Sequence, residues 1–188
     1  MENPFDGNME SGTNDTHAFV IQTLLRKYGV EDMASGGTIV DIGTGDGKLL
    51  AALSERYPDA QFFGVSTEPA KAKRNAPHAE IVNEDLKSLH FPDDFFTMAL
   101  TCNIFDYASD HVRYGGGRIK PGTYSFPELF SEVGRILVPR GLYVPVEEGR
   151  DAYFSPETKE LFGSHFDPVG KPLEDIGLFR KAYKKRCS

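Results

Sequence analysis

Hydrophobic and polar positions along the chain follow two periods, one typical of strands and one typical of helices. Short apolar runs predict strands at residues 38–42, 61–65, 79–82, 93–103 and 141–146. Apolar residues at helical spacing predict helices at about residues 15–28, 46–57, 67–76, 125–138 and 155–163. Because the two kinds of element alternate, we expect an α/β fold with a doubly wound, mostly parallel sheet and helices on both faces.

Cap and turn residues refine this pattern. "SFPE" places Ser125 three positions before Glu128, which predicts a capping box, and Thr67 predicts a cap for the helix that follows it. Segments 165–170 and 177–185 predict a closing antiparallel pair of strands. Residues 1–14 are polar and acidic, so we expect a disordered N-terminus followed by a single domain over residues 15–188.

The chain has 188 residues and a formal net charge of -7, with 39% hydrophobic and 26% charged residues, as in ordinary globular proteins. The acidic charge argues against a nucleic-acid partner, because phosphate contacts require clustered Lys and Arg. The basic run at residues 180–186 is interpreted as a solvated last strand and tail. Two cysteines, Cys102 and Cys187, fit a reducing compartment, and no segment has the pattern of a signal peptide, a membrane span or a metal site. We therefore expect a cytoplasmic protein.

The segment "IVDIGTGDGKLLAAL" at residues 39–53 runs from an apolar strand through three glycines into an apolar helix. A dinucleotide-binding loop needs G-x-G-x-x-G, but Lys48 stands where the third glycine belongs. A triphosphate-binding loop needs G-x-x-x-x-G-K-[ST], but Leu49 replaces the hydroxyl residue and Ile42 replaces the first glycine. Neither nucleotide motif is matched.

The remaining pattern, D-I-G-T-G-D-G between a strand and a helix, resembles the class I S-adenosylmethionine-dependent methyltransferases, which have a Rossmann-like sheet. The resemblance implies that Asp41 accepts a hydrogen bond from the methionine ammonium. It also implies that Gly43, Thr44, Gly45 and Gly47 form a loop whose backbone the cofactor can approach closely, with the methionine carboxylate at the helix N-terminus. The expected cofactor is S-adenosylmethionine.

Two further segments resemble this family in the expected order. Residues 82–100 carry an acid and an apolar residue after a strand, which implies that Asp85 accepts from the adenine amino group and that the Leu86 backbone lies beside the ring. Residues 130–146 resemble the family's hydrophobic helix that ends in L-x-P-x-G before a strand. The resemblance is closest to the small-molecule methyltransferases of the quinone-biosynthesis type.

The ribose position departs from the family pattern. Where the family ends its second strand with an acid that holds the ribose diol, this chain has Ser66, and the nearest acid is Glu68. Glu68 could reach the ribose if the strand end is bulged, or it could sit in the first turn of the next helix, where an acid suits the dipole. Both residues stay candidates, and Asn103 at the end of the fourth strand is also assigned to the cofactor.

The acceptor is expected over residues 102–124, which follow the fourth strand at the ligand-binding edge of such sheets. Methyl transfer needs a base only if the acceptor loses a proton, and Asp106 is the best candidate, ahead of His111. Tyr107 and Tyr114 could stack on an aromatic acceptor or could only pin the loop.

The leading hypothesis is therefore S-adenosylmethionine-dependent methyl transfer to a small-molecule acceptor. One alternative is an RNA methyltransferase, because D-I-G-T-G-D-G also occurs among enzymes that modify ribosomal RNA and the C-terminal run is basic. The other is a non-catalytic cofactor-binding module that acts by protein contact, which the missing acid after the second strand supports. The sequence leaves the acceptor atom and the oligomeric state open.

Overall fold

The computed structural model describes residues 13–102, 104, 124–147, 156–169, 179–180 and 182–187 of the chain. Its helices are α1 (Thr13–Lys27), η1 (Glu31–Met33), α2 (Lys48–Arg56), α3 (Pro69–Asn75), α4 (Phe126–Ile136) and α5 (Pro156–His165). Its strands are β1 (Thr38–Ile42), β2 (Gln61–Val65), β3 (Glu80–Val82), β4 (Phe96–Cys102), β5 (Leu137–Glu147), β6 (Phe166–Pro168), β7 (Phe179–Arg180) and β8 (Tyr183–Lys185).

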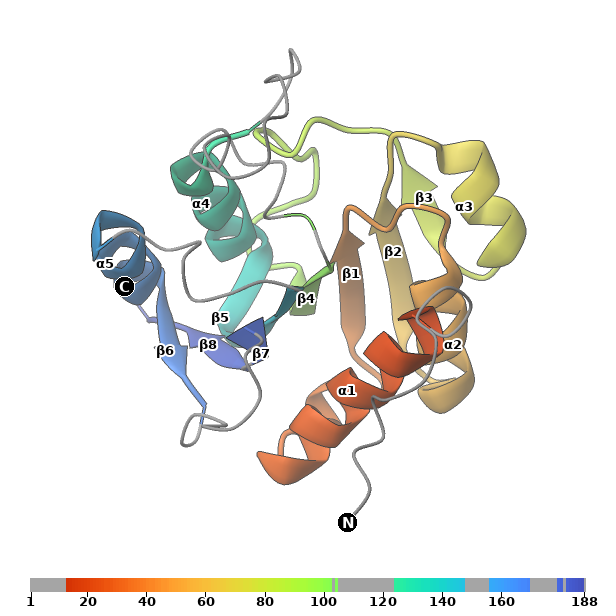
Figure 1. The fold of residues 1–188 in the computed structure, drawn as a ribbon, viewed down its shortest axis with the longest axis horizontal. Coiled ribbons are helices and arrows are strands. Elements are labelled where there is room, and N and C mark those ends of the chain that lie inside the picture. The colour runs from red at the N-terminus through yellow and green to blue at the C-terminus, as the bar shows by residue number, and fades with distance from the viewer. Residues whose placement is uncertain are drawn as a thin grey trace.

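The strands form one mixed sheet in the order β3-β2-β1-β4-β5-β8-β6, with β7 paired to β5. Neighbours from β3 to β5 are parallel, whereas β6, β7 and β8 form antiparallel pairs. The expected doubly wound, mostly parallel sheet with an antiparallel C-terminal end is confirmed. The chain order reverses at β1, and in such sheets ligands bind beyond the carboxyl ends of the strands at this point. The loops after β1, β2 and β3 lie together along the upper edge of the sheet in Figure 1.

Two hydrophobic cores cover the two faces of the sheet. Successive strand residues point to opposite faces, so Ile39 packs with α1 and α2, whereas Val40 packs with α4. The same alternation places Leu142 in the first core and Tyr143 in the second. Both faces are therefore buried, as expected for a mainly parallel sheet. Among the described residues, no helix is long and apolar enough to cross a membrane.

The helix boundaries correct the sequence prediction at three places. α1 begins at Thr13, two residues before the predicted start. α2 begins at Lys48 rather than two residues earlier, because Gly47 has a positive φ of 83° and still belongs to the loop. The N-cap of α3 is Glu68 and not Thr67, because the proline after Glu68 occupies the start of the helix.

The strand boundaries differ in β5 and at the C-terminal end. β5 begins at Leu137, which pairs with Phe96, and its register with β4 then shifts before Leu142 pairs with Met98. The sequence analysis predicted that this strand begins at residue 141, because the residues between these two pairs have the pattern of a loop. The predicted strand at 177–185 contains two short strands, because β7 and β8 pair with different parts of β5.

Side chains fix α4 at both ends. The predicted capping box is confirmed, since the Ser125 amide donates to Glu128 at 2.7 Å and the Glu128 amide donates to the Ser125 hydroxyl at 3.4 Å. In its last turn, Arg135 donates to Glu132 at 2.8 Å. Arg135 also donates to the backbone carbonyls of Leu89 and Phe91, at 2.6 and 2.8 Å. The loop between β3 and β4, which carries the predicted adenine-binding residues, is therefore anchored to α4.

We expect Arg135→Ala to lower the free energy of unfolding by about 2–4 kcal/mol, because it leaves Glu132 and the loop carbonyls without their shared donor. Burial raises the pKa of Glu132, but the hydrogen bonds from Arg135 and the Leu89 amide outweigh it and hold this pKa below its ordinary value. The stability that these hydrogen bonds to Glu132 give the folded protein is present above the unfolded pKa of about 4.3 and is lost as the pH falls through the folded pKa.

Urea denaturation at pH 7 and below pH 4 measures this effect, with the exposed Lys73→Ala as the control. The difference between wild type and Arg135→Ala should shrink at the lower pH. A loss no larger than that of the control at pH 7 would show that the loop does not depend on Arg135.

Candidate functional site

The glycine loop after β1 folds back over the end of β2. The amides of Gly43 and Thr44 both donate to the Val65 carbonyl, at 3.0 and 2.9 Å, and the Gly47 amide donates to the Thr44 carbonyl at 2.9 Å. Gly43, Gly45 and Gly47 all have positive φ, at 83°, 54° and 83°, a region that favours glycine. Among the described residues, the amides of Gly45 and Asp46 have no hydrogen-bond partner.

The three glycines serve different purposes. A Cβ on Gly43 would lie 2.5 Å from the Ile104 side chain, and one on Gly47 would lie 2.5 Å from the backbone oxygen of Ala72 in α3. These two glycines are therefore required by packing within the protein itself. A Cβ on Gly45 would meet no atom closer than 4.0 Å among the described residues, so Gly45 faces open space. Of the three, Gly45 is the one that leaves room for a ligand.

Asp41 lies at the end of β1, directly beneath this loop, and is 1% exposed. Burial raises the pKa of its carboxyl to about 7, an effect that the neighbouring Thr44 hydroxyl partly offsets. Asp41 Oδ1 and Thr44 Oγ1 nevertheless have no hydrogen-bond partner within bonding geometry among the described residues. Buried polar atoms without partners are rare in proteins, and these two lie where a ligand is expected.

The hydroxyl of Ser66 ties the glycine loop to the end of β2. It donates to the Gly45 carbonyl at 2.9 Å and accepts from the Glu68 amide at 3.0 Å, and Ser66 is 4% exposed. The Glu68 side chain is 64% exposed and lies 3.4 Å from the Lys71 ammonium, one turn along α3. Of the two residues that could bind the ribose, Ser66 already donates its hydroxyl hydrogen to the Gly45 carbonyl, whereas Glu68 makes only a surface ion pair.

The predicted adenine-binding residues lie in the loop after β3. Asp85 is exposed, its Oδ1 accepts from the Lys87 amide at 3.0 Å, and its carbonyl accepts from the Ser88 amide at 3.1 Å. Leu86 is partly buried against the core on the α4 side of the sheet. One carboxylate oxygen of Asp85 thus closes a local turn.

The acceptor side is only partly described. Asn103, the predicted base Asp106 and the rest of the 105–123 segment lie outside the described residues. At the carboxyl end of β4, the Cys102 thiol lies 3.0 Å from Nδ1 of His17, a buried histidine of α1. The sequence analysis missed this pair, because 85 positions separate its members and no motif links them.

Gly64 is a second residue that the sequence analysis did not single out. A Cβ there would lie 2.8 Å from side-chain atoms of both Leu50 in α2 and Thr44 in the loop. The glycine in the apolar run 61–65 therefore allows α2 and the loop to pack closely on β2. A lone glycine within a strand pattern is the signal that could have indicated such a close approach.

The unpartnered groups match the ends of an amino acid. A buried carboxyl and a hydroxyl suit an ammonium, and two free backbone amides near the start of α2 suit a carboxylate. Gly45, whose Cβ position no described atom approaches closer than 4.0 Å, belongs to the same loop. The residues present therefore fit the methionyl end of S-adenosylmethionine.

Comparisons with known proteins agree with this assignment. Residues 39–115, which contain the glycine loop, β2 to β4 and all of β1 except Thr38, match the sequence profile of a family described as a methyltransferase domain. Among solved structures, an S-adenosylmethionine-dependent methyltransferase from Aquifex aeolicus has a TM-score of 0.63 and 15% identity, covering 95% of this chain and 100% of that one. A TehB-like S-adenosylmethionine-dependent methyltransferase from Corynebacterium glutamicum has a TM-score of 0.61 and 15% identity, covering 94% and 100%.

A third structure is the geranyl diphosphate C-methyltransferase from Streptomyces coelicolor, solved with Mg²⁺, geranyl diphosphate and S-adenosylhomocysteine. It has a TM-score of 0.53 and 14% identity, covering 90% of this chain and 72% of that one. At these identities the three structures establish a shared fold. The chain thus has the fold of S-adenosylmethionine-dependent methyltransferases, and its residues 39–115 are similar to a methyltransferase domain.

Proposed function

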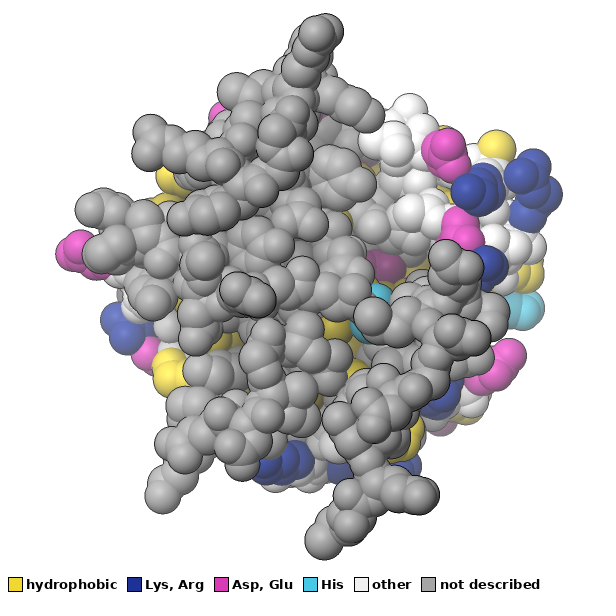
Figure 2. Space-filling view, in the orientation of Figure 1, with side chains coloured by type: hydrophobic (Ala, Val, Ile, Leu, Met, Phe, Trp, Pro, Cys, Tyr) yellow, Lys and Arg dark blue, Asp and Glu magenta, His cyan; other side chains and the backbone are white. Residues whose placement is uncertain are grey.

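We propose that this protein transfers the methyl group of S-adenosylmethionine to a small-molecule acceptor. The observation that carries the proposal is the distribution of cations around the cofactor loop. Lys48 is paired with Asp46 at 3.1 Å and Lys71 with Glu68 at 3.4 Å, so each of these two cations has an acid beside it. On the α2 and α3 side of Figure 2, basic and acidic side chains alternate along the rim.

The basic C-terminal run does not distinguish the two acceptor classes by its position. Lys184 pairs with Leu142 at the middle of β5, whereas Arg180 pairs with Val146 nearer the carboxyl end of that strand. The geranyl diphosphate C-methyltransferase of the same fold is named for a small-molecule acceptor, which also favours the proposal.

The cofactor-binding roles proposed here follow from the unpartnered groups. Asp41 and Thr44 receive the ammonium, and the amides of Gly45 and Asp46 receive the carboxylate. Glu68 holds the ribose diol, because a carboxylate can accept from both hydroxyls and Ser66 is occupied by the loop. In the loop after β3, Asp85 accepts from the adenine amino group and Leu86 lies beside the ring.

When bound, S-adenosylmethionine supplies a methyl group on a positively charged sulfur, which is already activated for displacement. The chain then has to orient the acceptor and exclude water. Ile104 packs over Gly43 and supplies an apolar wall beside the loop. His17 and Cys102 lie at the carboxyl end of β4, where the acceptor approaches, and Asp106 stays the predicted base for an acceptor that loses a proton.

Transfer of a labelled methyl group tests the proposed function directly. The protein is incubated with methyl-labelled S-adenosylmethionine and either the dialysable fraction of a cell extract or total RNA. We expect label in the dialysable fraction, and none with Gly45→Val, whose branched side chain enters the space left for the cofactor. Label in RNA alone would show that the acceptor class is wrong.

We expect Asp41→Asn to weaken S-adenosylmethionine binding at least about tenfold, on the scale of a charged hydrogen bond. The same change should stabilise the free protein at pH 8. With its pKa raised to about 7, the carboxyl contributes stability fully below its unfolded pKa of about 3.9 and loses it as the pH rises through the folded value. The amide cannot ionise, so the free energy of unfolding at pH 8 should rise by on the order of 2 kcal/mol.

Calorimetry and urea denaturation measure the two effects, with the exposed Asp59→Asn as the matched control. A higher free energy of unfolding combined with weaker cofactor binding would show that Asp41 serves the ligand and not the stability of the fold. Normal affinity in Asp41→Asn would remove this residue from the cofactor site.

Variants of Glu68 and Ser66 test which of the two residues binds the ribose. Glu68→Gln should weaken cofactor binding about tenfold with an unchanged melting temperature, because its ion pair with Lys71 is exposed. Ser66→Ala should lower the stability by about 1–2 kcal/mol, because the Gly45 carbonyl and the Glu68 amide lose their shared hydroxyl. Lys71→Gln controls for loss of the ion pair. If Glu68→Gln binds normally, Glu68 belongs only to the helix start.

Asp85 requires a pair of variants, because one of its oxygens closes a local turn. Asp85→Asn keeps an oxygen for the Lys87 amide but loses an acceptor for the adenine amino group, whereas Asp85→Ala loses both. We expect both variants to weaken the cofactor by about 1.5–3 kcal/mol, with a lower melting temperature only in the alanine variant. Full affinity in Asp85→Asn would place the adenine elsewhere.

A further inference from the structure

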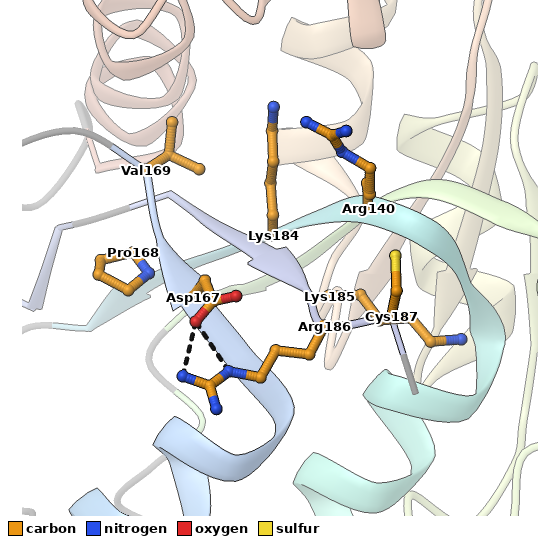
Figure 3. A pocket seen from close by; sticks show the side chains of 8 residues that line it. All are labelled: Arg140, Asp167, Pro168, Val169, Lys184, Lys185, Arg186 and Cys187. Carbon is orange, nitrogen blue, oxygen red and sulfur yellow. Dashed lines mark hydrogen bonds and ion pairs between the residues drawn. The ribbon is translucent and has the colours of Figure 1, made fainter.

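A basic pocket lies away from the cofactor loop, where β5, β6 and β8 meet (Figure 3). It is a hollow of about 510 Å³ whose charged lining residues are Arg140, Asp167, Lys184, Lys185 and Arg186. Among the described residues, one acid and four cations thus line the pocket, in a chain whose formal net charge is -7. The register of β4 and β5 places this pocket beside the Met98–Leu142 pair, four residues before Cys102 at the carboxyl end of β4. Four strand residues span about 13 Å, so the pocket is separate from the methyl-transfer site.

Two of the four cations are neutralised within the protein. Arg186 donates through Nε to Asp167 Oδ1 at 2.7 Å, and a terminal nitrogen of its guanidinium lies 2.7 Å from the same oxygen. Lys185 Nζ lies 2.6 Å from Asp94 Oδ1 and donates to the Leu137 carbonyl at 2.7 Å. These two pairs build the wall of the pocket and are not available to a ligand.

The other two cations, Arg140 and Lys184, have no hydrogen bond or ion pair with any acid among the described residues. Lys184 lies opposite Leu142 in the antiparallel pair of β5 and β8, and Arg140 comes two residues before Leu142. Both side chains line the same hollow, from the neighbouring strands β5 and β8. Figure 3 shows both side chains extending in the same direction, away from the Asp167–Arg186 pair. Two like charges held on one side of a hollow repel each other unless an anion joins them.

The backbone at Arg140 is strained. Its φ is 64°, and it follows Pro139 and precedes Gly141, which is the pattern of a type II turn with Pro at the second position. The third position of that turn favours glycine, and any other residue with a Cβ costs about 1 kcal/mol there. A glycine would make the same turn more easily, so the Arg side chain is retained at a cost in stability.

We propose that Arg140 and Lys184 form a binding site for a dianionic phosphate group, in the form of inorganic phosphate or a small phosphate monoester. The two unpaired cations match the charge of such a group at neutral pH, which lies between about -1.5 and -2. The planar guanidinium can donate two parallel hydrogen bonds to phosphate oxygens, and the ammonium adds a point charge. A nucleic-acid backbone is disfavoured, because two free cations neutralise too few phosphates to hold it at physiological salt.

Thermal unfolding of the full chain with increasing inorganic phosphate, at constant ionic strength, tests this site. We expect the melting temperature of the wild type to rise with phosphate, as for any ligand that binds only the folded protein. Arg140→Gly and Lys184→Gln should each raise the apparent dissociation constant for phosphate about tenfold or more. Lys73→Gln on α3, which removes the same charge elsewhere, should respond as the wild type does.

Arg140→Gly is the decisive variant, because glycine relieves the positive φ and the protein should fold at least as well without phosphate. An equal phosphate response in Arg140→Gly would show a general salt effect and overturn the proposal. A short single-stranded RNA that binds more tightly than phosphate, with affinity lost in the same variant, would also overturn it in favour of a nucleic-acid surface. Normal S-adenosylmethionine affinity in both variants is expected, because neither residue touches the cofactor loop.

Discussion

Burying the Asp41 carboxyl at the end of β1 costs free energy that only a proton or a ligand can recover. The other parts of the site surround this buried carboxyl. The sheet order puts β1 at the centre, so its carboxyl end lies where the chain order reverses and a cleft edge forms. Among the described residues, Asp41 Oδ1, the Thr44 hydroxyl and two backbone amides of the glycine loop have no partners. A ligand with an ammonium and a carboxylate would supply partners to all of them.

Contacts on both faces of the sheet hold the two loops of the site in position. Ser66 fixes the loop to the end of β2, and Gly47 fits against the backbone of α3. On the other face, Arg135 of α4 anchors the loop that carries Asp85. The residues proposed to bind the cofactor are few, and the surrounding contacts hold them in place in the absence of a ligand, which would lower the entropic cost of binding.

The fold class was predictable from the sequence because alternating apolar periods specify a parallel sheet with helices on both faces. The cofactor loop was predictable because its glycines are adjacent in sequence and follow a strand. What could not be predicted depends on contacts between distant residues. The Ser66 hydroxyl looked free for the ribose until its bond to Gly45 was known. The His17–Cys102 pair joins α1 to β4 across the sheet, and the early start of β5 depends on pairing between Leu137 and Phe96.

The central claim is that the unpartnered Asp41 carboxyl is the anchor for the cofactor's ammonium. Its pKa of about 7 in the free protein means that binding must release a proton wherever the free carboxyl is protonated. Calorimetry of S-adenosylhomocysteine binding in two buffers of different ionisation enthalpy measures that release. We predict about half a proton at pH 7, close to one at pH 6 and almost none at pH 8. Binding without proton release at pH 6 would contradict the account.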